Sequence, residues 1–264
     1  LDGLYLNIHR YKEDGRDNLS LFIDKFGSSD NSSSAPFILE ASELNVTNSH
    51  IIVFDETIKY PESFNARDLN MVASDFKIDG GVITANIETS NFLMHTGVMK
   101  EENGVTDLIV KSLKSDFTYT SSQIHIADLY IETAGSRLNG DLKLNYEDNN
   151  FSDFTNKVNW DFQIDESIIA TNELRLFYNE IVKNETVELS GHMTGILNDF
   201  KVNQMKAKTL NDISIDGDMH FVNVVDNLDD FHIEGNFNQL RVSNKDLKAF
   251  LPNILGKSLP VEVD

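Results

Sequence analysis

The sequence contains no cysteine and only four prolines among its 264 residues. Without cysteine the chain has no disulfides, no thiolate catalysis and no cysteine-ligated zinc site. This absence fits a bacterial periplasm or cytoplasm, and it disfavours a small secreted domain that depends on disulfides. Because proline removes a hydrogen bond from a β-ladder, so few prolines leave any strands nearly uninterrupted.

Basic residues are also scarce: 22 lysines and arginines stand against 43 aspartates and glutamates, giving a formal charge of −21. A surface that binds nucleic acid needs clustered cations to neutralise phosphates, and the sequence has no such cluster. Nucleic acid is therefore excluded as a partner. An anionic membrane surface would repel this body, so we expect any membrane contact to be made through segments missing from this sequence.

Long apolar runs are absent, since none approaches the roughly 20 residues needed to span a bilayer. The N-terminus shows no signal peptide, begins with Leu1 and is already in strand rhythm. Residues 260–264 resemble the start of another strand. We therefore interpret residues 1–264 as a single elongated segment of a longer protein, without a linker that would divide it into domains.

Catalytic and metal-binding motifs are missing as well. The Gly256-Lys257-Ser258 sequence lacks the first glycine of a phosphate-binding loop and follows a predicted helix instead of a strand. The seven histidines show no helical i, i+4 pair, and Gly-x-Ser-x-Gly does not occur. A glycan-active enzyme would need a cluster of carboxylates on one face, and no pattern indicates one. We predict no catalytic residue, no metal site and no cofactor.

What the sequence does contain is alternation of apolar and polar residues from one end to the other. The clearest run is Val158, Trp160, Phe162 and Ile164, with polar residues between them. Alternation with a period of two predicts strands with one apolar and one polar face. It predicts about fifteen to eighteen strands, in a sheet on the order of 70–90 Å long. One short helix is expected, at about residues 244–256.

A short phrase recurs five times in these runs: an apolar residue, any residue, glycine, any residue, and an apolar residue. Glycine inside a strand marks a bulge, a bend or a close backbone approach. We therefore predict that these glycines bend the sheet by a similar amount in each repeat, although direct contact with a ligand is an alternative. The predicted bend glycines are Gly80, Gly140, Gly191, Gly217 and Gly235.

The apolar face of such a sheet has to be covered, and the sequence offers few helices to cover it. The remaining architectures are a closed sandwich, a closed β-helix, or a folded sheet whose interior holds lipid. A lipid groove and a plain hydrophobic core would use the same residue types. The candidate inward residues are Leu142, Leu144, Val158, Trp160, Phe162, Ile164, Leu189, Met193, Ile213, Ile215, Met219, Phe221, Phe231, Ile233 and Phe237.

Two repeat units carry a family resemblance: Leu69 to Gly80 and Leu129 to Gly140. Each combines an alternating apolar stretch with the glycine phrase, and they resemble units of the TamB branch of the AsmA-like proteins. Residues 246–252 and 256–260 are similar to a helical interruption in TamB-like proteins (translocation and assembly module) of the Bacteroidota. The resemblance extends over essentially the whole chain. The membrane helix and the barrel-contacting region of that family lie outside this sequence.

The resemblance implies an all-β fold, a long repetitive sheet folded into a trough with an apolar groove (a β-taco). It also implies anchoring in the inner membrane, a periplasmic location and a reach to the outer membrane. The expected function is to carry phospholipid along the groove for outer-membrane biogenesis, with an outer-membrane β-barrel protein of the TamA or BamA type as partner and no enzymatic activity. The alternative is a non-enzymatic β-rich scaffold, an adhesin, or an assembly factor that binds such a barrel.

Overall fold

The computed structural model describes residues 1–13, 17–18, 21, 38–56, 62–95, 107–147, 154–177, 181–209, 213–224 and 230–242. These residues form one twelve-stranded sheet in which the strands lie in chain order. The strands are β1 (Tyr5–Arg10), β2 (Ile38–Asp55), β3 (Glu62–Asp79), β4 (Val82–His95), β5 (Asp107–Tyr119), β6 (Gln123–Glu132), β7 (Arg137–Asn145), β8 (Asn159–Ala170), β9 (Thr186–Ile196), β10 (Asp199–Thr209), β11 (Ser214–Val222) and β12 (His232–Arg241).

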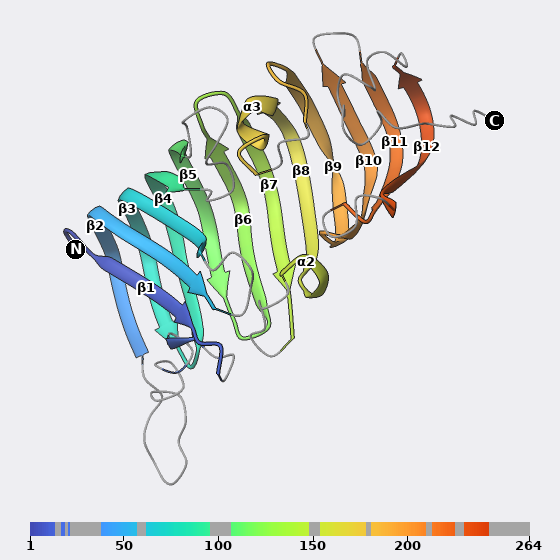
Figure 1. The fold of residues 1–264 in the computed structure, drawn as a ribbon. Helices are drawn as coiled ribbons and strands as arrows, with labels where there is room; N and C mark the ends of the chain where they lie inside the picture. The colour runs from blue at the N-terminus through green and yellow to red at the C-terminus, as the bar shows by residue number, and fades with distance from the viewer. Residues whose placement is uncertain are drawn as a thin grey trace.

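Each strand pairs antiparallel with the next, except that β1 and β2 are parallel. The sheet therefore extends from β1 at one end to β12 at the other, and its strands curve, so that the sheet forms a trough (Figure 1). The all-β fold class predicted from the alternation is confirmed, and the open, curved sheet agrees with the trough that the resemblance implies. The order resembles that of a solenoid, because every strand pairs with the strand that precedes it in the sequence.

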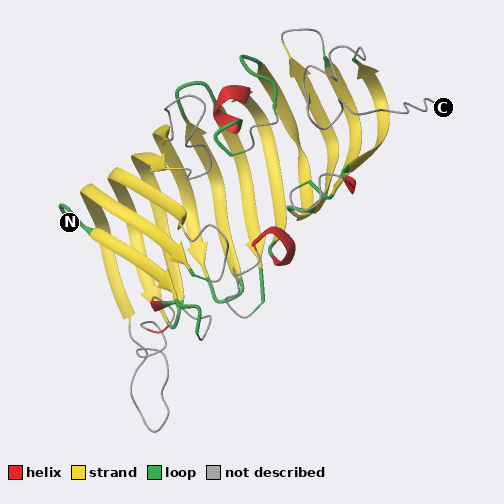
Figure 2. Ribbon diagram, in the orientation of Figure 1, coloured by secondary structure: helices red, strands yellow, loops and turns green. Residues whose placement is uncertain are grey.

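Two short helices, α2 (Phe154–Lys157) and α3 (Thr171–Leu174), lie beside the sheet (Figure 2). The sequence pattern does not indicate either of them, because four residues are too few to show a helical period. The helix predicted at residues 244–256 lies outside the described residues.

The described residues form twelve strands, fewer than the fifteen to eighteen predicted for the whole chain. Strand β6 gives one reason for the difference: Ile124 and Ile126 share one parity, whereas Leu129 and Ile131 share the other, so the pattern predicts two separate runs. Both runs belong to a single strand, interrupted by a bulge at Asp128, whose φ is 48°. With strands about 4.8 Å apart, the twelve strands make a sheet of about 55 Å.

These bulges recur in neighbouring strands. Non-glycine residues with positive φ lie at register shifts in β2 (Asn48), β3 (Asp68), β6 (Asp128) and β10 (Gln204). Asparagine and aspartate tolerate the left-handed conformation better than most residues, and bulges increase the bend and twist of a strand. These shifts form a line across the sheet, which we call the crease, and the sheet folds along it into a trough. A further shift in β3, at Asp75, lies away from the crease.

Three of the predicted bend glycines lie at the crease, one in every second strand from β7 to β11. From β6 to β12, one row of large residues alternates with glycines, and we call it the crease row. Neighbouring members are directly paired, except that Gly191 and Met205 approach each other across the bulge of β10. The members of the row are Leu129, Gly140, Ile164, Gly191, Met205, Gly217 and Phe237. The glycines in β7, β9 and β11 thus leave space beside the large side chains of β6, β8, β10 and β12.

The three crease glycines are closely packed. A Cβ atom on Gly140 would lie 2.1 Å from the Gln163 carbonyl oxygen, and one on Gly217 would lie 2.3 Å from the Asn236 carbonyl oxygen. On Gly191 it would lie 3.1 Å from the Met205 Cα, and φ there is +152°. The distances at Gly140 and Gly217 are too short for a side chain, and at Gly191 the positive φ strains any other residue, so the backbone favours glycine at all three positions.

The other two glycines of the phrase have different places. Gly80 is not inside a strand: it forms, with Gly81, the turn between β3 and β4, where both have positive φ, so the bend predicted for it is wrong. Two residues with positive φ are the requirement of a tight hairpin turn. Gly235 lies within β12 opposite Met219, in a stretch of regular register, and the ring of Phe237 covers it.

Candidate functional site: the concave apolar face

The apolar residues of the trough form two further rows that cross the sheet. The first, the rim row, connects directly paired residues of β2 to β12 and contains one glycine, Gly195. Its members are Leu39, Ile78, Ile83, Tyr119, Ile124, Leu144, Trp160, Gly195, Phe200, Phe221 and Ile233. Because paired residues point to the same side of a sheet, this row is a continuous apolar stripe on one face.

The second, the middle row, lies between the rim row and the crease. Its members are Ala85, Phe117, Ile126, Leu142, Phe162, Met193, Val202 and Met219, and it ends at Gly235. The crease divides the sheet into two parts, which we call the walls of the trough. Leu142 and Phe162 of the middle row belong to a buried apolar cluster, and Leu138 and Leu189, from the wall beyond the crease, pack against the same cluster. The two walls therefore meet over this face, which is the concave side of the trough.

Eight of the fifteen residues predicted to point inward lie in the rim and middle rows, and Ile164 and Phe237 lie in the crease row. Twelve of the fifteen lie within strands β7 to β12, whereas Val158, Ile213 and Phe231 lie directly before β8, β11 and β12. Ile215 pairs with Ala207, which pairs with Leu189, and these residues belong to the wall beyond the crease. The inward residues of β2 to β5, which extend the same stripe, are not among the predicted candidates.

Exposure changes along the trough. Around β7 and β8 the face is closed by its own side chains, since Val158 is 0% exposed and Phe162 and Ile164 are each 8% exposed. At β12 the face is open, with Phe237 36% and Leu240 49% exposed. The middle of the trough is thus a packed core, and the accessible apolar surface lies toward β12.

Small polar residues buried along the crease were missed by sequence reasoning. Ser167 accepts a hydrogen bond from the Asn139 backbone N–H at 3.0 Å, and Ser49 accepts one from the Leu4 backbone N–H at 3.0 Å. A bulge leaves backbone groups unpaired, and buried unpaired groups are costly, so these hydroxyls compensate for the bend. In both strands the alternation of apolar and polar residues changes parity at two polar residues followed by a serine, and this pattern could have indicated the buried hydroxyl.

The opposite, convex face carries pairs of histidine and carboxylate on neighbouring strands. His125 lies 3.0 Å from Asp141, and His192 and His220 lie 2.6 Å from Asp161 and Asp199 respectively. No group of three or more residues of the metal-binding types comes together within the described ranges. The histidines on this face make cross-strand contacts between neighbouring strands.

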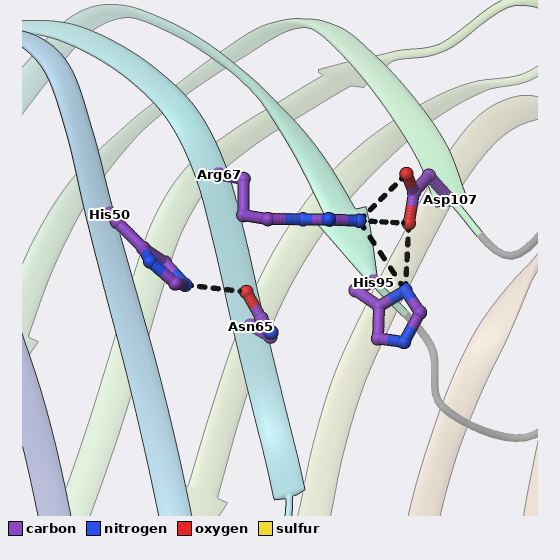
Figure 3. A network of polar contacts seen from close by, with 5 residues as sticks. All are labelled: His50, Asn65, Arg67, His95 and Asp107. Atoms are coloured by element: carbon purple, nitrogen blue, oxygen red, sulfur yellow. Dashed lines mark hydrogen bonds and ion pairs between the residues drawn. The ribbon is translucent and has the colours of Figure 1, made fainter.

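A polar network joins β3, β4 and β5 near the N-terminal end, and a separate pair beside it joins β2 and β3 (Figure 3). Arg67 donates to both oxygens of Asp107, at 2.7 and 2.8 Å, and the His95 ring lies 2.8 Å from the same carboxylate. His50 and Asn65 form a separate pair at 2.8 Å. Burial raises the pKa of the Asp107 carboxyl, but the contacts with His95 and Arg67 outweigh it and hold that pKa below its usual value.

This network predicts a pH-dependent contribution to stability. Because the pKa of Asp107 is lower in the folded than in the unfolded chain, its contribution is present above the usual value of 3.8 and is lost as the pH falls through the folded pKa. We expect Asp107→Asn to lower the urea midpoint more at pH 7 than at pH 3, because the contribution of the ionised carboxylate decreases once the pH falls below 3.8. A difference between the two proteins that is equal at both pH values would contradict this assignment.

Comparisons with protein-family models, with curated proteins and with solved structures find no match to this chain. Among the described residues, no helix has the length and apolar character needed to cross a membrane. The function therefore has to be inferred from the geometry of the trough and from the resemblance of the repeat units.

Proposed function

We propose that this chain is a segment of a periplasmic bridge that carries phospholipid acyl chains along its concave apolar face between the inner and outer membranes. The proposal follows from the TamB-like resemblance of the repeats. The observation that supports it best is the rim row, an apolar stripe that passes from β2 to β12. The polar convex face would remain in water, and no catalysis is needed.

The physical argument is that an acyl chain on this face stays out of water, which is worth about 0.8 kcal/mol for each buried methylene. Phe221 and Ile215 are only partly buried and lie in β11, next to β12, where the apolar face is exposed.

The packed middle sets a condition on this function. Between β6 and β8 the side chains already fill the trough, so passage along its full length requires them to move. We propose that lipid first contacts β9 to β12. The same observation favours the second candidate, a non-enzymatic scaffold or assembly factor for an outer-membrane barrel, in which the packed core serves only to stiffen the sheet.

An inward charge distinguishes the two candidates. We expect Ile215→Asp or Phe221→Asp to leave the chain folded by circular dichroism and to remove phospholipid that co-purifies from a bacterial periplasm, measured by native mass spectrometry with lipid extraction. Ser214→Asp, which places the same charge on the neighbouring outward residue, is the matched control and should retain the lipid. Wild-type chain without lipid, or unfolding of both inward variants, would contradict the conduit and favour the scaffold.

A further inference from the structure

Trp160, the only tryptophan of the chain, carries a buried hydrogen-bond donor on the concave face. It lies in β8 and belongs to the rim row. In the part of the chain that the structure describes, no acceptor lies within hydrogen-bond distance of its indole nitrogen, Nε1. An indole nitrogen can only donate, and a buried donor left unpaired costs free energy, so this N–H is available to a ligand.

The position of this donor distinguishes it from the other buried side-chain atoms without a partner. Among the described residues these are Arg67 Nε, Ser115 Oγ and Thr209 Oγ1. None of the three belongs to the rim, middle or crease row. Trp160 is therefore the described member of these rows whose unpaired donor a ligand on the concave face would meet.

The paired and stacked neighbours of the indole are uncharged. Trp160 is directly paired with Leu144 on one side and with Gly195 on the other, and it packs against the buried cluster. Because Gly195 has no side chain, the indole has no cross-strand side chain beside it there. Phe154 of α2 lies edge-on to the indole, with ring centroids 5.7 Å apart, and is 36% exposed. The donor thus lies among apolar groups, and Phe154 separates it from the surface.

These neighbours determine which acceptor fits. A phosphate or carboxylate beside the indole would lose its hydration, and no cation among these neighbours would compensate for the loss. A neutral carbonyl can accept the N–H bond at a much smaller desolvation cost. In a phospholipid the neutral acceptors are the acyl ester carbonyls, at the junction of the acyl chains and the headgroup. Tryptophan side chains are enriched at the same depth of a bilayer, where apolar and polar surroundings meet.

We propose that the Trp160 N–H donates a hydrogen bond to an acyl ester carbonyl of a bound phospholipid. This contact places the junction of acyl chains and headgroup at β8, and the acyl chains extend along the rim row toward β12, past Phe200 and Phe221. The headgroup lies on the side of Phe154, toward solvent. The inference rests on the proposed function and names the contact that orients the lipid.

The test compares two soluble lipids that differ only at the proposed acceptor. Dihexanoyl-phosphatidylcholine is titrated below its critical micelle concentration, and so is its diether analogue, which lacks the two carbonyl oxygens. Because the chain has one tryptophan, a single indole cross-peak in the ¹H–¹⁵N NMR spectrum reports on Trp160. We expect the diester to shift the indole proton downfield and to bind about fivefold more tightly than the diether, the effect of one neutral hydrogen bond.

Two variants separate the hydrogen bond from apolar contact. Trp160→Phe keeps an aromatic ring and removes the N–H, so we expect it to bind the two lipids equally, with about the affinity of the wild-type chain for the diether. Phe200→Leu, at the next large residue of the rim row, is the matched control. It removes apolar area only, and we expect it to weaken both lipids by the same factor. Circular dichroism checks that both variants are folded.

The outcomes distinguish this inference from the function on which it rests. Equal binding of diester and diether to the wild-type chain, with the indole proton unshifted, would overturn the inference without contradicting lipid transport. Binding of neither lipid to the wild-type chain would contradict both. If Trp160→Phe does not fold, the comparison of the two lipids on the wild-type chain still decides the question, because it needs no variant.

Discussion

Replacing Gly140 by alanine is expected to destabilise the sheet strongly, because the added methyl group has no space at the crease. The new Cβ would lie 2.1 Å from the Gln163 carbonyl oxygen and 3.0 Å from the Phe162 ring. A backbone atom cannot rotate away as a side chain can, so β7 and β8 must separate at the crease. Overpacking of this kind costs typically up to about 3 kcal/mol and occasionally more. The measurement is the urea midpoint of the purified variant, followed by circular dichroism.

Gly80→Asn is the matched control, because it also replaces a glycine in the repeated phrase. No atom lies within 4 Å of a Cβ at Gly80, and its φ of +56° is one that asparagine tolerates. Asparagine followed by Gly81 is a favourable pair for a tight hairpin turn, so the stability should change little. Equal losses in the two variants would show that the crease does not depend on close packing at Gly140.

Phe162→Ala is expected to cost about 3–5 kcal/mol, because it leaves a cavity in the packed middle of the trough. Phe162 is 8% exposed and belongs to the cluster that contains Leu142, Leu144 and Ile164. Its ring lies in the middle row between Leu142 and Met193. Since both walls contact this cluster, we expect the urea transition to move to a lower midpoint, and we expect hydrogen exchange to increase in β7 and β9.

The same substitution at Phe237 provides the comparison. Phe237 lies on the edge strand and is 36% exposed, so its removal leaves no enclosed cavity. We expect a loss of about 1–2 kcal/mol, from the apolar area alone. If Phe237→Ala cost as much as Phe162→Ala, the open end of the trough would have to be as closely packed as its middle.

The fold could be predicted from the sequence to the extent that each strand is regular. Trp160, Phe162 and Ile164 alternate with polar residues, and the structure places them on one face. Alternation identifies the face because neighbouring side chains of a strand point to opposite sides. The position of the glycines in the phrase was also informative, and three of the five lie in the crease.

The crease itself could not be predicted, because its bulges reverse the relation between sequence parity and face. A bulge adds a residue to one strand only, and the partner strand that shows this is distant in sequence. Asp128 is one example and Gln204 another: each is a polar residue between two apolar runs and reads equally well as a turn. How far the trough closes depends on contacts between its two walls, and the sequence of a single strand contains no information about those contacts.

The strand order has a consequence for how the length of the molecule can change. Because β2 to β12 each pair only with the strands adjacent in sequence, one even-numbered and one odd-numbered strand could be inserted or deleted together without altering any other pairing. The alternation of large residue and glycine would be preserved, and each pair of strands would add about 10 Å. Duplication or deletion of one hairpin would therefore lengthen or shorten the sheet without disturbing the pairing of the remaining strands.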